Sequence, residues 1–207
     1  DYEFADLIDQ QDKVRLLIDP TSSYAQAAAM AMGRAMDDVI IAAATGTAFT
    51  GETGATSTAA QTAIAAGGAG LTIAKLRTAK QTFDLASVDP SIPRHIIVGP
   101  EQITNLLSTT EVTSSDFNTV KALVQGEIDS FLGFKFTVSN RLAKSGNDRT
   151  CIAFAQDGIT LAIGKDVSAR IDERADKSYA TQVYYCMSIG ATRMEQAKVI
   201  GITCTEA

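Results

Sequence analysis

Residues 166–190, "DVSARIDERADKSYATQVYYCMSIG", decide the fold of this chain. In the first part, Val167, Ala169 and Ile171 alternate with polar residues. "RADK", residues 174–177, then forms a short polar turn. After the turn the alternation resumes, and one side of the chain carries Thr181, Val183, Tyr185, Met187 and Ile189. Two stretches of period 2 joined by a short polar turn predict an antiparallel hairpin.

Helical patterns precede this hairpin. Residues 21–45, rich in Ala and Met, follow Asp19-Pro20 and predict one helix of more than 20 residues. A second amphipathic helix is expected at 71–87, with Leu76, Ala79, Phe83 and Ala86 on one face. Shorter elements are expected as helices at 100–108 and 116–126 and as strands at 95–99, 134–140, 150–155 and 197–204. Helices followed by an antiparallel sheet indicate the α+β class.

Residues 42–70 differ from the rest, since 24 of these 29 residues are Gly, Ala or Thr. We expect a loop of low local stability, because such residues bury little apolar area. The glycines at its end, Gly67, Gly68 and Gly70, could suggest a phosphate loop. That motif needs a preceding strand and a following Lys-Ser/Thr, whereas Leu71-Thr72 stands there. A flexible loop leading into a helix is the favoured interpretation.

Composition and charge narrow the function classes. The net charge of −6 and the pI of about 4.8 argue against a dedicated grip on nucleic acid and against adhesion to anionic membranes. Cys151, Cys186, Cys204 and a single His95 disfavour a zinc site or a disulfide framework and fit a reducing compartment. No apolar run approaches the length of a membrane span. Because the chain starts at Asp1, we expect a missing or processed N-terminal segment, although a cloning boundary would look the same.

No constellation of residues predicts catalysis. His95 lies in an Ile-Ile-Val strand, where a structural role is favoured over that of a base, and no GxSxG motif is present. We therefore predict no enzyme activity and no catalytic, cofactor-binding or metal-binding residues. On the hairpin, carboxylates alternate with Arg170, Arg174 and Lys177, which indicates intersubunit or surface ion pairs. Lys75, Arg77 and Lys80 could contact a nucleic-acid backbone, but a solvated helix face is favoured.

Three stretches resemble the major capsid proteins of tailed bacteriophages, which share the shell fold named after the Hong Kong phage. They are "DKVRLLIDPTSSYAQAAAMAMGRAMDDVIIAA" (12–43), "RHIIVGPEQITNLL" (94–107) and "CIAFAQDGITLAIGKDVSARIDERADKSYATQVYYCMSIGATRMEQAKVIGI" (151–202). The resemblance implies an α+β fold with a long spine helix, an antiparallel peripheral sheet and a mixed axial domain. It also implies that residues 1–18 are the returning arm of an extended loop. Residues 19–70 would hold the spine helix and the Gly/Ala/Thr loop, 71–165 the axial domain, and 166–207 the peripheral strands.

The function implied by the resemblance is structural: a major capsid protein that self-assembles into an icosahedral shell around double-stranded DNA. Its expected partners are copies of itself in pentamers and hexamers, a scaffolding protein, a portal, and packaged DNA held only by loose contact. The expected location is the virion, with assembly in the bacterial cytoplasm, and no cofactor or membrane is implied. The candidate residues for intersubunit contact are Asp172, Glu173, Arg174 and Lys177 on the hairpin, and the turns bounded by Thr109 and Ser114 and by Lys144 and Arg149.

Three alternatives remain open from the sequence. The same fold could form the shell of an encapsulin-like bacterial nanocompartment, which a neighbouring cargo-enzyme gene would favour. The chain could instead be a soluble α+β enzyme, which a defined cavity would favour. A nucleic-acid-binding module is disfavoured by the charge, and a strongly salt-dependent DNA affinity would favour it.

Overall fold

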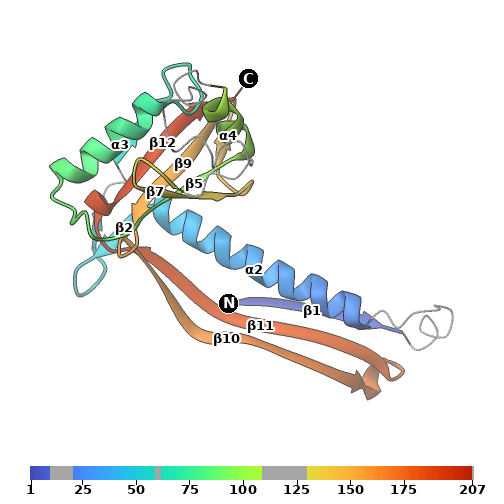
Figure 1. Ribbon diagram of the computed structural model, residues 1–207. Helices are drawn as coiled ribbons and strands as arrows, with labels where there is room; N and C mark the ends of the chain where they lie inside the picture. Colours follow the sequence, from blue (N-terminus) through green and yellow to red (C-terminus); the bar gives the residue numbers. More distant parts are fainter. Residues whose placement is uncertain (10–20, 59–61, 109–129, 207) are drawn as a thin grey trace. The chain divides into compact units, whose positions relative to one another are not determined.

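The computed structural model describes residues 1–9, 21–58, 62–108 and 130–206 (Figure 1). The chain packs into two compact units, each made of separate stretches of sequence. The first unit comprises residues 1–40 and 161–191, and the second comprises 41–160 and 192–207. These boundaries differ from the four expected segments, because residues 166–207 do not stay together: the chain passes to the second unit at residue 192.

The first unit contains a three-stranded sheet in the order β1-β11-β10. Its strands are β1 (Tyr2–Ile8), β10 (Ile159–Arg174) and β11 (Ala180–Arg193), and a 3-10 turn, η1 (Ala175–Lys177), joins the last two. The predicted hairpin is therefore confirmed, and its first strand begins earlier than expected. β1 pairs antiparallel with β11, so that Tyr2 lies opposite Met187 and Ile8 opposite Thr181. The predicted long helix is also confirmed as α2 (Thr21–Thr45).

The two strands of the hairpin differ in burial on the predicted apolar side. On β11 the predicted apolar side supplies the buried residues Thr181, Val183 and Met187, and α2 adds Ala28 and Met32. On β10, by contrast, Val167 and Ile171 of the predicted apolar side remain 36% and 49% exposed. β10 lies at one edge of this sheet, whereas β11 has a neighbour on each side. An apolar stripe thus stays uncovered within one copy of the chain.

The second unit is built on a seven-stranded sheet in the order β4-β12-β9-β5-β7-β6, with β8 paired to β9. Its strands are β4 (Thr62–Ile64), β5 (Arg94–Val98), β6 (Ser130–Phe131), β7 (Phe134–Val138), β8 (Lys144–Ser145), β9 (Asp148–Ala155) and β12 (Val199–Thr205). The pairs β12–β4 and β5–β7 are parallel and the others antiparallel. Cys151, Ile152 and Ala153 on β9 are fully buried, as expected for a strand bonded on both sides. This mixed sheet carries the main hydrophobic core.

Two further helices belong to this unit, α3 (Ile73–Leu85) and α4 (Pro100–Leu107). Thr72 caps α3, since its hydroxyl accepts a hydrogen bond from the Lys75 amide. The predicted face of α3 is buried through Leu76, Ala79 and Phe83, but Ala86 is exposed. The reason is that Ala86 is the C-cap, where the chain has already left the helix. The helix expected at 116–126 lies outside the described residues.

The expectation of a loop over residues 42–70 was wrong in part. β2 (Ala48–Thr50) and β3 (Thr56–Thr58) form a small antiparallel sheet, and β4 joins the large sheet. In the parallel pairing of β4 with β12, Thr62 is the partner of Ile200 and Ile64 of Ile202. Strand pairing satisfies backbone groups whatever the side chains, so a segment poor in large apolar residues can still be ordered by a distant strand.

Candidate assembly site

The end of the β10–β11 hairpin, residues 172–179, which we call the hairpin tip, carries charges of both signs. Asp172, Glu173 and Lys177 are exposed around η1. Arg174 is turned onto Asp176: its Nε donates to Oδ1 at 2.9 Å and its Nη2 to Oδ2 at 2.5 Å. This guanidinium holds the pKa of the Asp176 carboxyl below its usual value. Arg174 is therefore paired with a neighbouring carboxylate at the tip, and the other three candidates are exposed there.

The backbone of the tip is unusual. Ser178 and Tyr179 have φ of 52° and 58°, two successive non-glycine residues in the left-handed region. L-residues adopt this region at a cost, and such outliers cluster at functional sites. Tyr179 in this turn has 62% of its surface exposed. Sequence reasoning missed Tyr179, because no glycine or asparagine marks the turn and the tyrosine fits the strand pattern.

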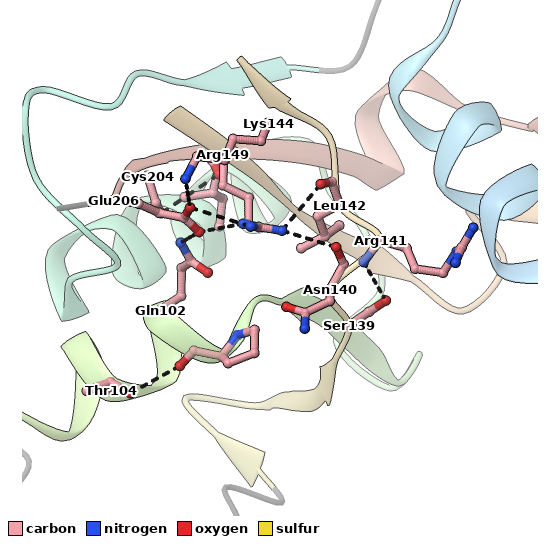
Figure 2. Close-up of polar contacts among 12 residues, drawn as sticks. Gln102, Thr104, Ser139, Asn140, Arg141, Leu142, Lys144, Arg149, Cys204 and Glu206 are labelled. Atoms are coloured by element: carbon pink, nitrogen blue, oxygen red, sulfur yellow. Dashed lines mark hydrogen bonds and ion pairs between the residues drawn. The ribbon is translucent and has the colours of Figure 1, made fainter. Parts of the chain in front are cut away.

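The candidates Lys144 and Arg149 lie in the second unit, and their cationic groups point toward Glu206 (Figure 2). Both bind the carboxylate of Glu206, Arg149 through its Nε and Lys144 through its Nζ, which lies 2.5 Å from Oε2. Gln102 Nε2 adds a third hydrogen bond to Glu206 at 3.0 Å. Arg149 first, then Lys144 and Gln102, lower the pKa of Glu206 to about 2. We call Glu206, Lys144, Arg149 and Gln102 the Glu206 cluster.

Strand pairing brings the Glu206 cluster together. β8 and β9 form a hairpin in which Lys144 lies opposite Arg149. β12 pairs with β9 up to Thr205, opposite Asp148, and the Glu206 amide then donates to Asn147 O at 2.7 Å. The cluster thus fixes the end of β12 to the β8–β9 hairpin. Sequence reasoning missed Glu206, since its partners are far away in the chain and no local motif marks it.

The remaining expected interface turn, bounded by Thr109 and Ser114, lies outside the described residues. Among the described ones, the candidates thus separate into two places. Asp172, Glu173, Arg174 and Lys177 share the hairpin tip, whereas Lys144 and Arg149 share the Glu206 cluster.

The glycine-rich stretch before α3 is ordered by a lysine. Lys75 Nζ donates to the carbonyls of Ala69, Gly70 and Thr203 at 2.7, 3.0 and 3.0 Å. Gly67 and Gly68 have left-handed φ of 57° and 66°. A phosphate loop converges backbone N–H groups on its ligand, whereas here the carbonyls of the segment converge on a cation. The stretch leads into α3 as expected, but it is anchored by Lys75. The Lys75 side chain therefore does not belong to the solvated helix face that was expected for it.

The single histidine and the cysteines sit in structural surroundings. The His95 ring stacks on Phe154 with centroids 5.6 Å apart, and partial burial, with Lys135 nearby, lowers its pKa. Cys151 and Cys204 are buried, and the three cysteines are free thiols. Within the described ranges, no group of three or more His, Cys, Asp or Glu side chains is placed to hold a metal ion. No helix in this part of the chain has the length and apolar character to cross a membrane.

Several solved structures share the fold of this chain. The chain is similar to a protein of Mycobacterium phage Che8, with 20% identity and a TM-score of 0.72 over 97% of this chain and 69% of that one. It is similar to the capsid of cyanophage P-SCSP1u, with 16% identity and a TM-score of 0.73 over 100% and 72%. A virus-like particle from Pyrococcus furiosus matches with 14% identity and a TM-score of 0.61 over 97% and 75%. These likenesses confirm the predicted α+β shell fold.

The sequence matches no curated protein. The model of one protein family, described as phage capsid protein, matches residues 1–206 and so spans both units and the hairpin tip. That match confirms the resemblance on which the expected structural, non-enzymatic role rested. It assigns the protein to the virion and to self-assembly with further copies of itself. The chain belongs to the phage capsid protein family.

Proposed function

We propose that the chain is the major subunit of an icosahedral phage head that encloses double-stranded DNA. The observation that carries the proposal is the family match over residues 1–206. A shell subunit needs broad contacts that close by symmetry rather than a substrate pocket. The first unit offers such surfaces, since it combines a charged tip with apolar residues left exposed on its edge strand.

The two units correspond to the two domains of the proposed shell subunit. The first, with α2 as spine helix and the sheet β1-β11-β10, is the peripheral domain, and β1 belongs to the returning arm of the extended loop. The second, with the seven-stranded sheet, is the axial domain that clusters in pentamers and hexamers. Residues 192–207 go with the axial domain in this proposal, because β12 pairs with β9.

The hairpin tip is the proposed intersubunit contact. Asp172, Glu173 and Lys177 carry both signs of charge, so one copy can complement another. Tyr179 adds an exposed aromatic anchor of the kind that dominates interface energies. Lys144 and Arg149 play a smaller part, since Glu206 already binds both, and only Lys144 keeps 43% of its side chain exposed.

The proposed partners beyond further copies are a scaffolding protein and a portal during assembly in the bacterial cytoplasm. Contact with the genome is loose, because the net charge of −6 disfavours tight binding to phosphates. A container that confines DNA by its wall does not need to grip it.

Mass measurement tests the proposal. The complete open reading frame is expressed in bacteria, and the product is examined by light scattering and electron microscopy. Closed shells of megadalton mass are expected. Nucleic acid inside the shells, or DNA-filled heads in infected cells, supports the genome container, whereas a cargo enzyme inside supports a nanocompartment. A stable monomer or dimer, even with a scaffold supplied, would contradict the shell function.

A further inference from the structure

Two hollows adjoin along the exposed side of α3 in the second unit. One, of about 590 Å³, is lined by residues including Arg77, Lys80 and Leu85. The other, of about 280 Å³, is lined by Pro90, Ile92, Pro93 and Arg94 among others. Lys80, Asp84 and Leu132 line both. We call the two together the α3 groove.

The charges of the α3 groove do not balance. Of the residues that the structure describes, Asp84 is the one carboxylate that lines the groove, and Arg94 Nη2 already donates to Asp84 Oδ1 at 2.8 Å. Among the described residues the structure records no ion pair for Arg77 or Lys80, and both are exposed. The groove is therefore net positive in a chain whose formal net charge is −6. Such a site favours a carboxylate-bearing ligand.

A buried polar atom gives an independent sign of a missing partner. Arg94 is 7% exposed, its guanidinium lies 5.3 Å from the centre of the Phe83 ring, and Nη2 also donates to Val88 O. Its Nε is buried and makes no hydrogen bond. Nearly all buried donors in native proteins are satisfied. An unpaired donor on an arginine that lines the groove indicates that a ligand with an acceptor oxygen completes the site.

The apolar residues of the groove define the rest of the ligand. Leu85 is 78% exposed at the end of α3, and Leu132 is presented by a two-residue turn in which Leu132 and Gly133 have φ of 52° and 85°. Cations beside an exposed leucine, exposed prolines and the half-buried Ile92 and Leu132 suit a peptide that alternates acidic and apolar residues. A phosphate backbone fits less well, because it brings no apolar side chains to contact Leu85 and Leu132.

We propose that the α3 groove binds an extended acidic peptide segment of a partner protein. Residues 77–85 of a helix span about 12 Å, which about four extended residues cover. The carboxylates of the segment pair with Arg77, Lys80 and Arg94, and its apolar residues contact Leu85 and Leu132. This inference does not depend on shell formation.

Fluorescence anisotropy on the unassembled full chain at low salt tests the proposal. The probe is the labelled peptide DLEDLE, and its uncharged counterpart NLQNLQ is the matched control. DLEDLE should bind at least about tenfold more tightly, because exposed pairs contribute modestly but several act together. The double variant Arg77→Gln/Lys80→Gln should weaken binding about fivefold. Lys135→Gln, an exposed cation of β7 outside the groove, should leave it unchanged.

Other results would overturn the proposal. Equal binding of the two peptides, or equal binding by the double variant and the native chain, would remove the groove as an acidic-peptide site. A short single-stranded oligonucleotide that binds more tightly than DLEDLE, and loses affinity in the double variant, would assign the groove to nucleic acid instead. Both substituted side chains are exposed, so we expect the double variant to keep its fold. Circular dichroism should verify this.

Discussion

At the scale of single residues, Glu206 is the buried carboxylate that holds the Glu206 cluster of the second unit together. It is 4% exposed, and a buried charge is tolerated only when it is paired and hydrogen-bonded. Arg149, Lys144 and Gln102 together supply this pairing (Figure 2). Because Glu206 follows β12, the cluster ties a late strand of the chain to the β8–β9 hairpin.

The substitution Glu206→Gln should therefore destabilise the second unit. It leaves Arg149, whose side chain is 15% exposed, without its counter-charge. Removing one partner of a buried pair is costly, and we expect a loss of about 2–3 kcal/mol in the free energy of unfolding. Urea unfolding followed by circular dichroism measures it. Glu52→Gln, at an exposed turn, is the control, and an equal effect of both substitutions would contradict the role of the cluster.

The same carboxylate predicts a dependence on pH. Its pKa is lowered from 4.5 to about 2 in the folded protein, so the unfolded chain binds more protons between these values. The contribution of Glu206 is then complete above pH 4.5 and is lost as the pH falls towards 2. The difference in unfolding free energy between the native chain and Glu206→Gln should shrink over this range. A difference that stays constant from pH 6 to about pH 2.5 would contradict this assignment.

At the scale of elements, the end of α2 depends on a residue from β11. Arg193 is 3% exposed, and its Nη1 donates to the carbonyls of Ala44 and Gly46 at 3.0 and 2.9 Å. A cation at this place satisfies carbonyls that the helix itself leaves without partners and interacts favourably with the helix dipole. Arg193, together with the Thr45 hydroxyl that donates to Ile41 O at 3.0 Å, thereby closes the C-terminus of a helix of 25 residues.

Replacing this arginine should loosen the last turn of α2. Arg193→Met keeps much of the volume but removes the two hydrogen bonds, at a cost of about 2 kcal/mol. Hydrogen exchange should accelerate at the Gly46 amide, which donates to Ala42 O at 2.8 Å. In Arg193→Lys, which keeps a cation, the exchange rate at Gly46 should lie between those of the native chain and Arg193→Met. Unchanged exchange at Gly46 in the methionine variant would show that the turn holds without the cap.

The hairpin tip gives the second prediction at this scale. Glu173→Lys should reduce the yield of shells without changing subunit stability, because Glu173 is exposed and the structure records no ion pair for it among the described residues. Arg174→Glu should also reduce the yield, but partly by breaking its pair with Asp176. Shell yield by sedimentation and stability by urea unfolding separate these effects. An unchanged yield in both variants would remove this pair of residues from the contact.

The elements also show what the sequence can predict. The hairpin and α2 follow from periodicities of their own residues, so local patterns were enough. β4 could not be found in this way, because its order comes from pairing with β12, more than a hundred positions later. Lys144 and Arg149 were placed on an exposed turn for the same reason, since their counter-charge arrives only when β12 pairs with β9. Burial and charge pairing at these sites depend on long-range contacts that no local pattern encodes.

At the scale of the whole molecule, the two units differ in how fully they cover their apolar residues. The second unit encloses a continuous core around β9 and β12. Most of the large apolar side chains left exposed belong instead to the first unit. They are Tyr2, Leu7, Tyr24, Met30, Ile163, Val167, Ile171 and Tyr179. Exposed apolar surface of this extent marks sites of protein–protein interaction, and we therefore expect neighbouring subunits to cover these residues on assembly.

Assembly should therefore stabilise the first unit far more than the second. In the isolated subunit, amides of β10 and β11 in residues 161–191 should exchange much faster than those of β9 and β12, because fewer buried contacts oppose local opening. In closed shells the exchange of residues 161–191 should slow by at least about tenfold, while β9 and β12 change little. Hydrogen exchange with mass spectrometry on both forms measures this. Equal protection of the first unit before and after assembly would mean that neighbours do not cover its exposed apolar residues, and that contacts elsewhere hold the shell together.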